Sequence, residues 1–396
     1  MFSQKRWTCS TVLAAVGLLA APAVAQTKAT RNLTQKAGKY AVDLRIPQEG
    51  LYADEETDIE FHVADLSQDD PVQGAPPIVK AKIAAKLTMP AMPAMPAQDP
   101  KTHSEGVPGD YGVVVYFPHG GDYQLDLRIT PPEDKAFTVA FKVPVNDASA
   151  ARKPKPKPFT LDTAFRPREV RADTPTDITL VVRSRDTRQP VTDFDLVHEK
   201  KMHFVIVSKD LGQFAHEHPA WHEDGTFTLR YTFPTGGEYY LFADVAPHEA
   251  GDQVLMQTVN VKGTVPSPPD LKGLGTTDTV DGVKVALSTE ATRISARRTL
   301  PLAFSIKDAA SGAPITDLEP YLGAMAHLIL IQEGAATYVH CHPDESDPTN
   351  GHNGTLTFLA RFPAPGVYRG WIQIQRAGKV LTASFVVDVP AGKGEN

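Results

Sequence analysis

The chain has 396 residues, of which 41% are hydrophobic and 22% are charged, and its formal net charge is −7. This length predicts two to four domains, and an acidic, evenly mixed surface argues against nucleic acid and anionic membranes as partners. The two cysteines are Cys9 and Cys341. Because Cys9 lies in a segment that we expect to be removed, no intrachain disulfide is expected, and apolar cores must provide the stability.

Residues 1–25 have the pattern of a secretory signal peptide. Lys5 and Arg6 precede the apolar run TVLAAVGLLAAPAVA, which ends in the small residues Ala23-Val24-Ala25. The run is short for a membrane-spanning helix, which needs about 20 residues, so cleavage before Gln26 is favoured over a retained anchor. The mature protein is therefore expected in the periplasm or secreted, without a membrane attachment.

A Phe-Pro frame recurs three times along the rest of the chain. In each copy a Phe precedes a Pro, a Gly follows four residues after the Phe, and a Tyr stands two residues beyond the Gly. The frame predicts three units at residues 37–147, 159–262 and 280–390, with a Pro/Lys linker at 148–158 and a Pro- and Gly-rich linker at 263–279. The frame residues are Phe117, Gly121 and Tyr123; Phe233, Gly237 and Tyr239; and Phe362, Gly366 and Tyr368.

Every unit shows the two-residue hydrophobic period of β-strands. In TDITLVVRS, Ile178, Leu180 and Val182 fall on one face, and Gly, Pro and Asp separate such runs. The segment IVKAKIAAKL at 78–87 also alternates, so a strand is expected there rather than a helix. Short alternating strands in units of about 100 residues predict an all-β fold of three tandem immunoglobulin-like β-sandwiches.

The first unit contains the methionine-rich stretch TMPAMPAMPAQ, with Met89, Met92 and Met95. A Pro-rich stretch favours a polyproline helix with three residues per turn, which would align the three thioethers along one side. Such a row would suit a soft ion such as Cu(I). The alternative is a loop, or methionines that pack beneath the sandwich.

The second and third units share the pattern His-x12-His-x-His-Pro. The strand HFVIVS, the turn KDLG and the returning strand QFAHEHP place His203 opposite His218, and His216 lies on the same face because side chains two residues apart share a face. Three converging neutral imidazoles suit Cu(II) or Zn(II). In the third unit Met325 stands two residues before His327, which favours copper; in the second unit His198 or His222 could take that place. The two expected ligand sets are His203, His216 and His218, and His327, His340, His342 and Met325.

The chain also resembles known families. The first unit, with LTMPAMPAMP and GDYGVVVYFPHGGDY, resembles the YtkA-like domains, which are similar in architecture to CopC-type periplasmic copper carriers. The second and third units resemble secreted domains in which Met-His or Met-x-His precedes His-x-His-Pro. The resemblance implies a metal-binding, non-enzymatic role, although Gln26 is not the mature N-terminal histidine of a CopC-type site. It carries over to Met89, Met92, Met95, His203, His216, His218, Met325, His327, His340 and His342.

These observations predict an exported copper-binding protein for periplasmic buffering, tolerance or hand-over. Its partners would be the metal ion and a periplasmic metal exporter or acceptor protein. The alternatives are a zinc-binding protein and a purely structural Ig-like secreted protein. A multicopper-oxidase-like enzyme is disfavoured, because those enzymes need four His-x-His motifs and Glu217 stands where the third unit has Cys341. We expect Cys341 to be a buried apolar residue facing away from its neighbouring histidines.

Overall fold

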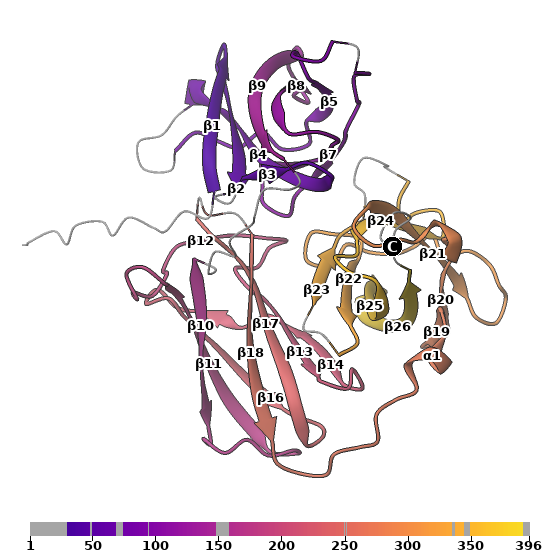
Figure 1. The fold of residues 1–396 in the computed structure, drawn as a ribbon. Coiled ribbons are helices and arrows are strands. Elements are labelled where there is room, and N and C mark those ends of the chain that lie inside the picture. Colours follow the sequence, from indigo (N-terminus) through magenta and orange to yellow (C-terminus); the bar gives the residue numbers. More distant parts are fainter. Residues whose placement is uncertain are drawn as a thin grey trace, which may run out of the picture.

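The structure is a computed structural model that describes residues 30–47, 50–68, 74–93, 95–147, 158–248, 250, 252–334, 337–343 and 349–390. Within these residues the strands form six sheets, which pair into three β-sandwiches (Figure 1). The predicted all-β sandwich fold is therefore confirmed. The expected signal peptide and nearly all of the Pro/Lys linker lie outside the described residues. No helix in the described part of the chain is both long and apolar enough to cross a membrane.

The first sandwich has sheets with strand orders β1-β2-β4-β7-β6 and β3-β9-β8-β5. Strand β3 pairs with β9 in parallel, and β8 pairs with β9 antiparallel. The inner faces of the two sheets enclose one apolar core, which includes Phe61 and Leu125. The elements are β1 (Thr30–Ala37), β2 (Tyr40–Pro47), β3 (Leu51–Tyr52), β4 (Glu55–Asp65), η1 (Leu66–Gln68), β5 (Lys82–Thr88), β6 (Lys101–Ser104), β7 (Asp110–Phe117), β8 (Gly121–Thr130) and β9 (Phe137–Asn146).

The second sandwich pairs the sheet β10-β11-β16-β15 with the sheet β12-β17-β13-β14, in which β18 also pairs with β17. Phe204 and Leu241 lie in its core. The elements are β10 (Phe159–Arg166), β11 (Pro175–Ser184), β12 (Phe194–Asp195), β13 (His203–Ser208), β14 (Phe214–Glu217), β15 (Ala220–Trp221), β16 (Thr226–Thr232), β17 (Gly237–Pro247) and β18 (Gln253–Val261).

The third sandwich pairs the sheet β19-β20-β21-β24 with the sheet β23-β22-β25-β26. Leu328 and Phe358 lie in its core. The elements are α1 (Leu271–Leu274), β19 (Thr277–Val280), β20 (Val283–Leu287), η2 (Ala291–Arg293), β21 (Thr299–Asp308), β22 (His327–Gln332), β23 (Tyr338–Cys341), β24 (Thr355–Arg361), β25 (Gly366–Arg376) and β26 (Lys379–Val389).

Some element boundaries differ from the sequence-based expectation. The first sandwich begins at Thr30 rather than at residue 37, because β1 pairs with β2. Strand β5 begins only at Lys82, since Lys80 has a φ of 57°, which breaks the extended backbone. The predicted linker at 263–279 contains helix α1 and the start of β19. Leu271 of α1 is buried in an apolar cluster, and α1 packs against β25 and β26 of the third sandwich.

The Phe-Pro frame has the same geometry in all three sandwiches. In each, the Tyr ring packs edge-on against the Phe ring, and the Tyr hydroxyl donates to the carbonyl oxygen four residues earlier. The intervening Gly has a φ between 124° and 138°, a conformation that favours glycine. The pairs Phe117–Tyr123, Phe233–Tyr239 and Phe362–Tyr368 have ring centroids 5.0, 5.1 and 5.0 Å apart.

The second and third sandwiches pack against each other through the outer faces of two sheets. All six residues of β13, HFVIVS, are buried, because both faces of this strand are covered. Phe204 and Ile206 face the core of the second sandwich. Val205 and Val207 face outward into a separate cluster that includes Ile329 of β22. The alternation of side chains along β13 therefore decides which residues meet the third sandwich.

Candidate metal centre

The histidines of the second sandwich lie on the outer face of the hairpin β13–β14. Val205 pairs with His216 and Phe204 with Glu217. Continued by one residue, this register sets His203 opposite His218, as the loop length predicts. All three histidines share a face with Val205, so they point away from their own core and toward the third sandwich.

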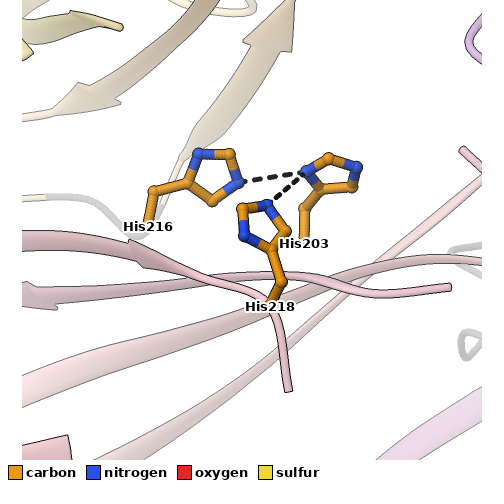
Figure 2. A group of neighbouring side chains, drawn as sticks. All are labelled: His203, His216 and His218. Carbon is orange, nitrogen blue, oxygen red and sulfur yellow. Dashed lines mark hydrogen bonds between the residues drawn. The ribbon is translucent and has the colours of Figure 1, made fainter. Parts of the chain in front are cut away.

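Figure 2 shows that the three rings turn their nitrogens toward one point. His203 Nδ1 lies 3.1 Å from His216 Nε2 and 3.3 Å from His218 Nε2. Nitrogens that share a tetrahedral ion at about 2.0–2.1 Å lie about 3.3 Å apart. The spacing therefore suits three ligands of one transition-metal ion. We call His203, His216 and His218 the second-sandwich trio.

The third sandwich repeats this arrangement with the same donor atoms. Ile329 pairs with His340 in the hairpin β22–β23. His327 Nδ1 lies 3.3 Å from His340 Nε2 and 3.1 Å from His342 Nε2. We call His327, His340 and His342 the third-sandwich trio. Cys341 points the other way, into the core of its own sandwich, as its position between two outward residues predicts.

Backbone carbonyl groups orient the first ring of each trio. His203 Nε2 lies 2.9 Å from the Val197 carbonyl oxygen, and His327 Nε2 lies 3.0 Å from the Tyr321 carbonyl oxygen. A carbonyl oxygen can only accept, so Nε2 carries the proton in both rings. This leaves the Nδ1 lone pair directed at the other two histidines, which is the arrangement that metal-ligating histidines adopt.

The second ring of each trio is oriented by the opposite sandwich. His216 Nδ1 donates to Gln373 Oε1 of β25 at 2.7 Å, and His340 Nδ1 donates to Asp244 Oδ2 of β17 at 2.9 Å. Gln373 is itself held by a hydrogen bond from its Nε2 to Thr382 Oγ1 at 3.1 Å. Each sandwich therefore fixes a histidine of the other. The two acceptors differ in charge, since one is an amide and the other a carboxylate.

The two trios form one cluster, although the sequence alone suggested two separate sites. The ring centroid of His203 lies 5.6 Å from that of His327 and 5.3 Å from that of His340. The centroid of His216 lies 5.8 Å from that of His327. One nitrogen from each of His203, His327 and His340 lies within 4.8 Å of the other two. The centroid distances between the trios are thus similar to those within the second-sandwich trio, where His203 lies 5.2 Å from His216 and 5.0 Å from His218.

His198 adds a seventh ring, but not where the sequence suggested. Its ring lies against His342 of the third-sandwich trio, with 3.6 Å between centroids and a tilt of 37°, whereas its centroid lies 6.5 Å from that of His203. Its backbone, at a φ of 44°, donates to the Gly106 carbonyl oxygen of the first sandwich. His198 therefore covers the outer side of the third-sandwich trio.

Burial keeps these rings neutral. It lowers the pKa of His198 to about 4 and of His218 to about 2, and it lowers the pKa of each of the other five rings below its usual value. Burial also raises the pKa of Asp244 to about 6. Neutral imidazoles offer lone pairs, so the cluster has the protonation state that metal ligation needs.

Met325 does not join the cluster. The chain before His327 turns at Leu322 and Gly323, with a bridge between Tyr321 and Ala324, rather than continuing the strand. The two-residue period therefore does not extend back to Met325. Its side chain packs against the core of the third sandwich instead. The prediction that Met325 shares the face of His327 was wrong for this reason. His222 also stays apart: it is exposed and pairs with Thr228 Oγ1 at 2.8 Å.

The expected row of methionines in the first sandwich was also wrong. Met89 is buried in the core, Met95 packs against it, and Met92 is 41% exposed. The backbone forms successive turns, in which the Met92 amide donates to the Met89 carbonyl oxygen and the Met95 amide to that of Met92. A polyproline helix has no such internal hydrogen bonds. Burying the apolar thioethers outweighs the conformational preference of the prolines.

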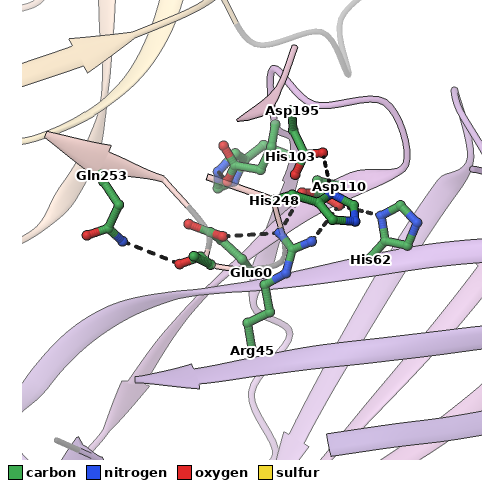
Figure 3. A network of polar contacts seen from close by, with 10 residues as sticks. Arg45, Glu60, His62, His103, Asp110, Asp195, His248 and Gln253 are labelled. Atoms are coloured by element: carbon green, nitrogen blue, oxygen red, sulfur yellow. Dashed lines mark hydrogen bonds and ion pairs between the residues drawn. The ribbon is translucent and has the colours of Figure 1, made fainter. Parts of the chain in front are cut away.

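A second polar group lies on the first sandwich. His103 Nε2 lies 3.1 Å from Asp58 Oδ2 and 3.0 Å from Glu105 Oε1. Burial lowers the pKa of His103, but the hydrogen bonds and charges of the two carboxylates outweigh burial and raise it to about 11. A protonated His103 therefore already supplies the positive charge at this place. In the nearby network in Figure 3, Asp110 binds Arg45 and His62.

A cavity of about 230 Å³ lies where the three sandwiches meet. Its wall includes His103 and Glu105 of the first sandwich, His198 of the second, and His340 and His342 of the third. The third-sandwich trio therefore borders open space on one side. The sequence analysis missed this cavity, because nothing in the sequence indicates how the sandwiches are arranged.

The comparisons with known proteins agree with this architecture. The chain belongs to a family described as a domain of unknown function, DUF8832, which matches it twice, over residues 160–263 and 278–391. Residues 34–128 match the YtkA-like family, as the sequence analysis expected. The second and third sandwiches thus carry one family repeat each, and the first carries another family. No curated protein matches the chain significantly.

Several solved structures are similar to this chain at low identity and low TM-score. At these values, the likeness carries no argument about function. They include the Escherichia coli adhesin FdeC (14% identity, TM-score 0.20, 91% of this chain and 99% of that chain), a bacterial ice-binding adhesin (10%, 0.20, 85% and 92%) and the bacterial integrin-binding protein invasin (15%, 0.18, 89% and 60%).

Proposed function

We propose that the protein is an exported copper-binding protein that buffers copper, supports tolerance to it, or hands it to a partner. The observation that carries this proposal is the convergence of ring nitrogens at 3.1–3.3 Å in two trios. Outward N–H groups held by fixed acceptors support it, because they leave the inward lone pairs free. The proposed role is binding rather than catalysis.

Copper is favoured over zinc by the donor set. A site of nitrogen donors binds Cu(II) more tightly than Zn(II), following the general order for divalent metals. The YtkA-like first sandwich supports copper through the architecture that this family shares with CopC-type carriers. The methionines do not support copper over zinc, because Met89 lies in the core of the first sandwich, and Met95 and Met325 pack against the cores of their sandwiches.

Hand-over would use the cavity at the junction of the sandwiches. The third-sandwich trio borders this cavity through His340 and His342. Glu105 lines the same cavity, where its carboxylate already pairs with protonated His103. A periplasmic exporter or acceptor protein would deliver or receive the ion from this side.

The test is a calorimetric titration of the chain lacking residues 1–25 with Cu(II), Cu(I) and Zn(II). Combined His216→Ala and His218→Ala changes should remove one bound ion, and His340→Ala with His342→Ala should remove another. His222→Ala is the matched control, because this exposed ring hydrogen-bonds Thr228 Oγ1 outside the cluster, so its loss should leave the copper load unchanged. A four-fold variant that keeps its full copper load would contradict the proposal, and a preference for Zn(II) would favour the zinc alternative.

A further inference from the structure

We propose that the two trios hold two ions side by side as one dinuclear centre, built jointly by the second and third sandwiches. This inference rests on the proposed function, because it concerns the same histidines. It differs from two independent sites in two respects: the ions are close enough to interact, and each depends on the opposite sandwich.

The distances between the trios support a shared centre. His203 and His327 each direct Nδ1 at their own partners, and their ring centroids are only 5.6 Å apart. An ion about 2 Å from each set of nitrogens would then lie on the order of 4–6 Å from its neighbour. Metal pairs in proteins that act together lie about 3.5–4 Å apart, so the cluster approaches that range without rearrangement.

The packing between the sandwiches holds the two halves in place. Phe214 stacks on Trp371 of β25 with centroids 4.5 Å apart, and Phe242 stacks on Tyr338 of β23 at 4.9 Å. These rings belong to or border the buried apolar cluster between the sandwiches. Both trios lie beside this apolar contact, so the site is organised by the fold before any ion arrives.

The two halves are not equivalent. His340 donates to a carboxylate, Asp244, whereas His216 donates to an amide, Gln373. A carboxylate makes the imidazole a stronger donor to a metal and adds a compensating negative charge. The third-sandwich trio should therefore fill first, and the second-sandwich trio should fill at higher copper concentration.

A competing arrangement is a single ion held between the sandwiches. One nitrogen from each of His203, His327 and His340 lies within 4.8 Å of the others, so one ion could bind there after a small shift. This arrangement would leave His216, His218 and His342 without an ion. It predicts one copper per chain, whereas the dinuclear centre predicts two.

The experiment is electron paramagnetic resonance of the chain lacking residues 1–25, loaded with Cu(II), alongside a chemical copper assay. The expected result is two coppers per chain with the spectrum of an interacting pair, seen as a half-field transition or as lost signal intensity. Dipolar coupling falls with the cube of the distance, so two remote ions would give the summed spectrum of isolated Cu(II). That summed spectrum, or one copper per chain, would overturn the dinuclear centre. No bound copper would instead overturn the proposed function.

Two kinds of variant sharpen this experiment. His216→Ala with His218→Ala should leave one copper whose full spin is detected and whose half-field transition is gone. Because large substitutions can unfold a buried site, Asp244→Asn and Gln373→Glu are the milder pair, since both keep every ring. At half loading, the parent should show a spectrum of the third-sandwich trio alone. In Asp244→Asn, copper at half loading should be spread over both trios, so the spectrum should show both. A half-loaded spectrum that neither substitution changes would exclude the proposed order of filling.

Discussion

Replacing Asp244 by Asn isolates the effect of one buried charge on one half of the histidine cluster. Asp244 Oδ2 lies 2.9 Å from His340 Nδ1, and the two side chains are only 13% and 5% exposed. The Asn side-chain oxygen can still accept the same hydrogen bond, so the ring orientation is kept and the negative charge is lost. Changes of such outer partners lower metal affinity by about 10–100-fold, which is about 1.4–2.8 kcal/mol of binding free energy.

The measurement is a competitive Cu(II) titration at pH 7.5 in a chain that also carries His216→Ala and His218→Ala, so that only the third-sandwich trio reports. The matched control is Gln373→Glu in a chain that carries His340→Ala and His342→Ala. Gln373 is the corresponding acceptor of the other half, and a carboxylate there should tighten copper binding by a similar factor. If Asp244→Asn stays within about twofold of its parent and Gln373→Glu gains nothing, the reasoning on the outer partners is refuted.

Three further predictions concern stability. The pKa of His103 rises from 6.5 to about 11 in the folded chain, so the stabilisation by protonated His103 is present below pH 6.5 and is lost as pH rises through 11. In urea denaturation, His103→Gln should therefore flatten the fall of the unfolding free energy over this pH window. An equal fall in both chains would refute this prediction. Trp371→Ala should lower the unfolding free energy by about 3–5 kcal/mol and weaken binding of the second copper ion, because this ring stacks on Phe214 between the sandwiches. Thermal unfolding and copper titration test this, and a loss of stability with unchanged copper binding would contradict the link between packing and binding. Met89→Ala should lower the unfolding free energy by about 2–5 kcal/mol without changing the number of bound copper ions. The loss of an ion would instead support copper binding by the methionines of the first sandwich.

The sequence predicted the fold and the local shape of each histidine hairpin well. Alternation in TDITLVVRS and the recurrent Phe-Pro frame depend on short-range rules of strands and turns, which act within a few residues. The same rules place His203 opposite His218, because a four-residue loop fixes the register. These features need no knowledge of distant contacts.

The rest depended on contacts that periodicity does not encode. The period of two was extended to Met325, but the chain turns before β22, so the parity was lost. The methionine stretch was interpreted by backbone preference, while burial of Met89 decided its conformation. The sequence does contain one indication of these contacts. The strands HFVIVS and HLILIQ are apolar on both faces, which indicates that their outer faces are covered. That signal could have indicated that the two hairpins, and hence the histidines, meet.

The connection between the second and third sandwiches has a consequence for capture from dilute solution. Because residues 262–276 join the two halves in one chain, and Leu271 is buried in the apolar cluster that both halves share, the halves meet at a local concentration fixed by this tether rather than by the number of molecules present. A site shared by two separate chains would fall apart as the protein became scarce. Here the fraction of molecules with an assembled histidine cluster should not change on dilution.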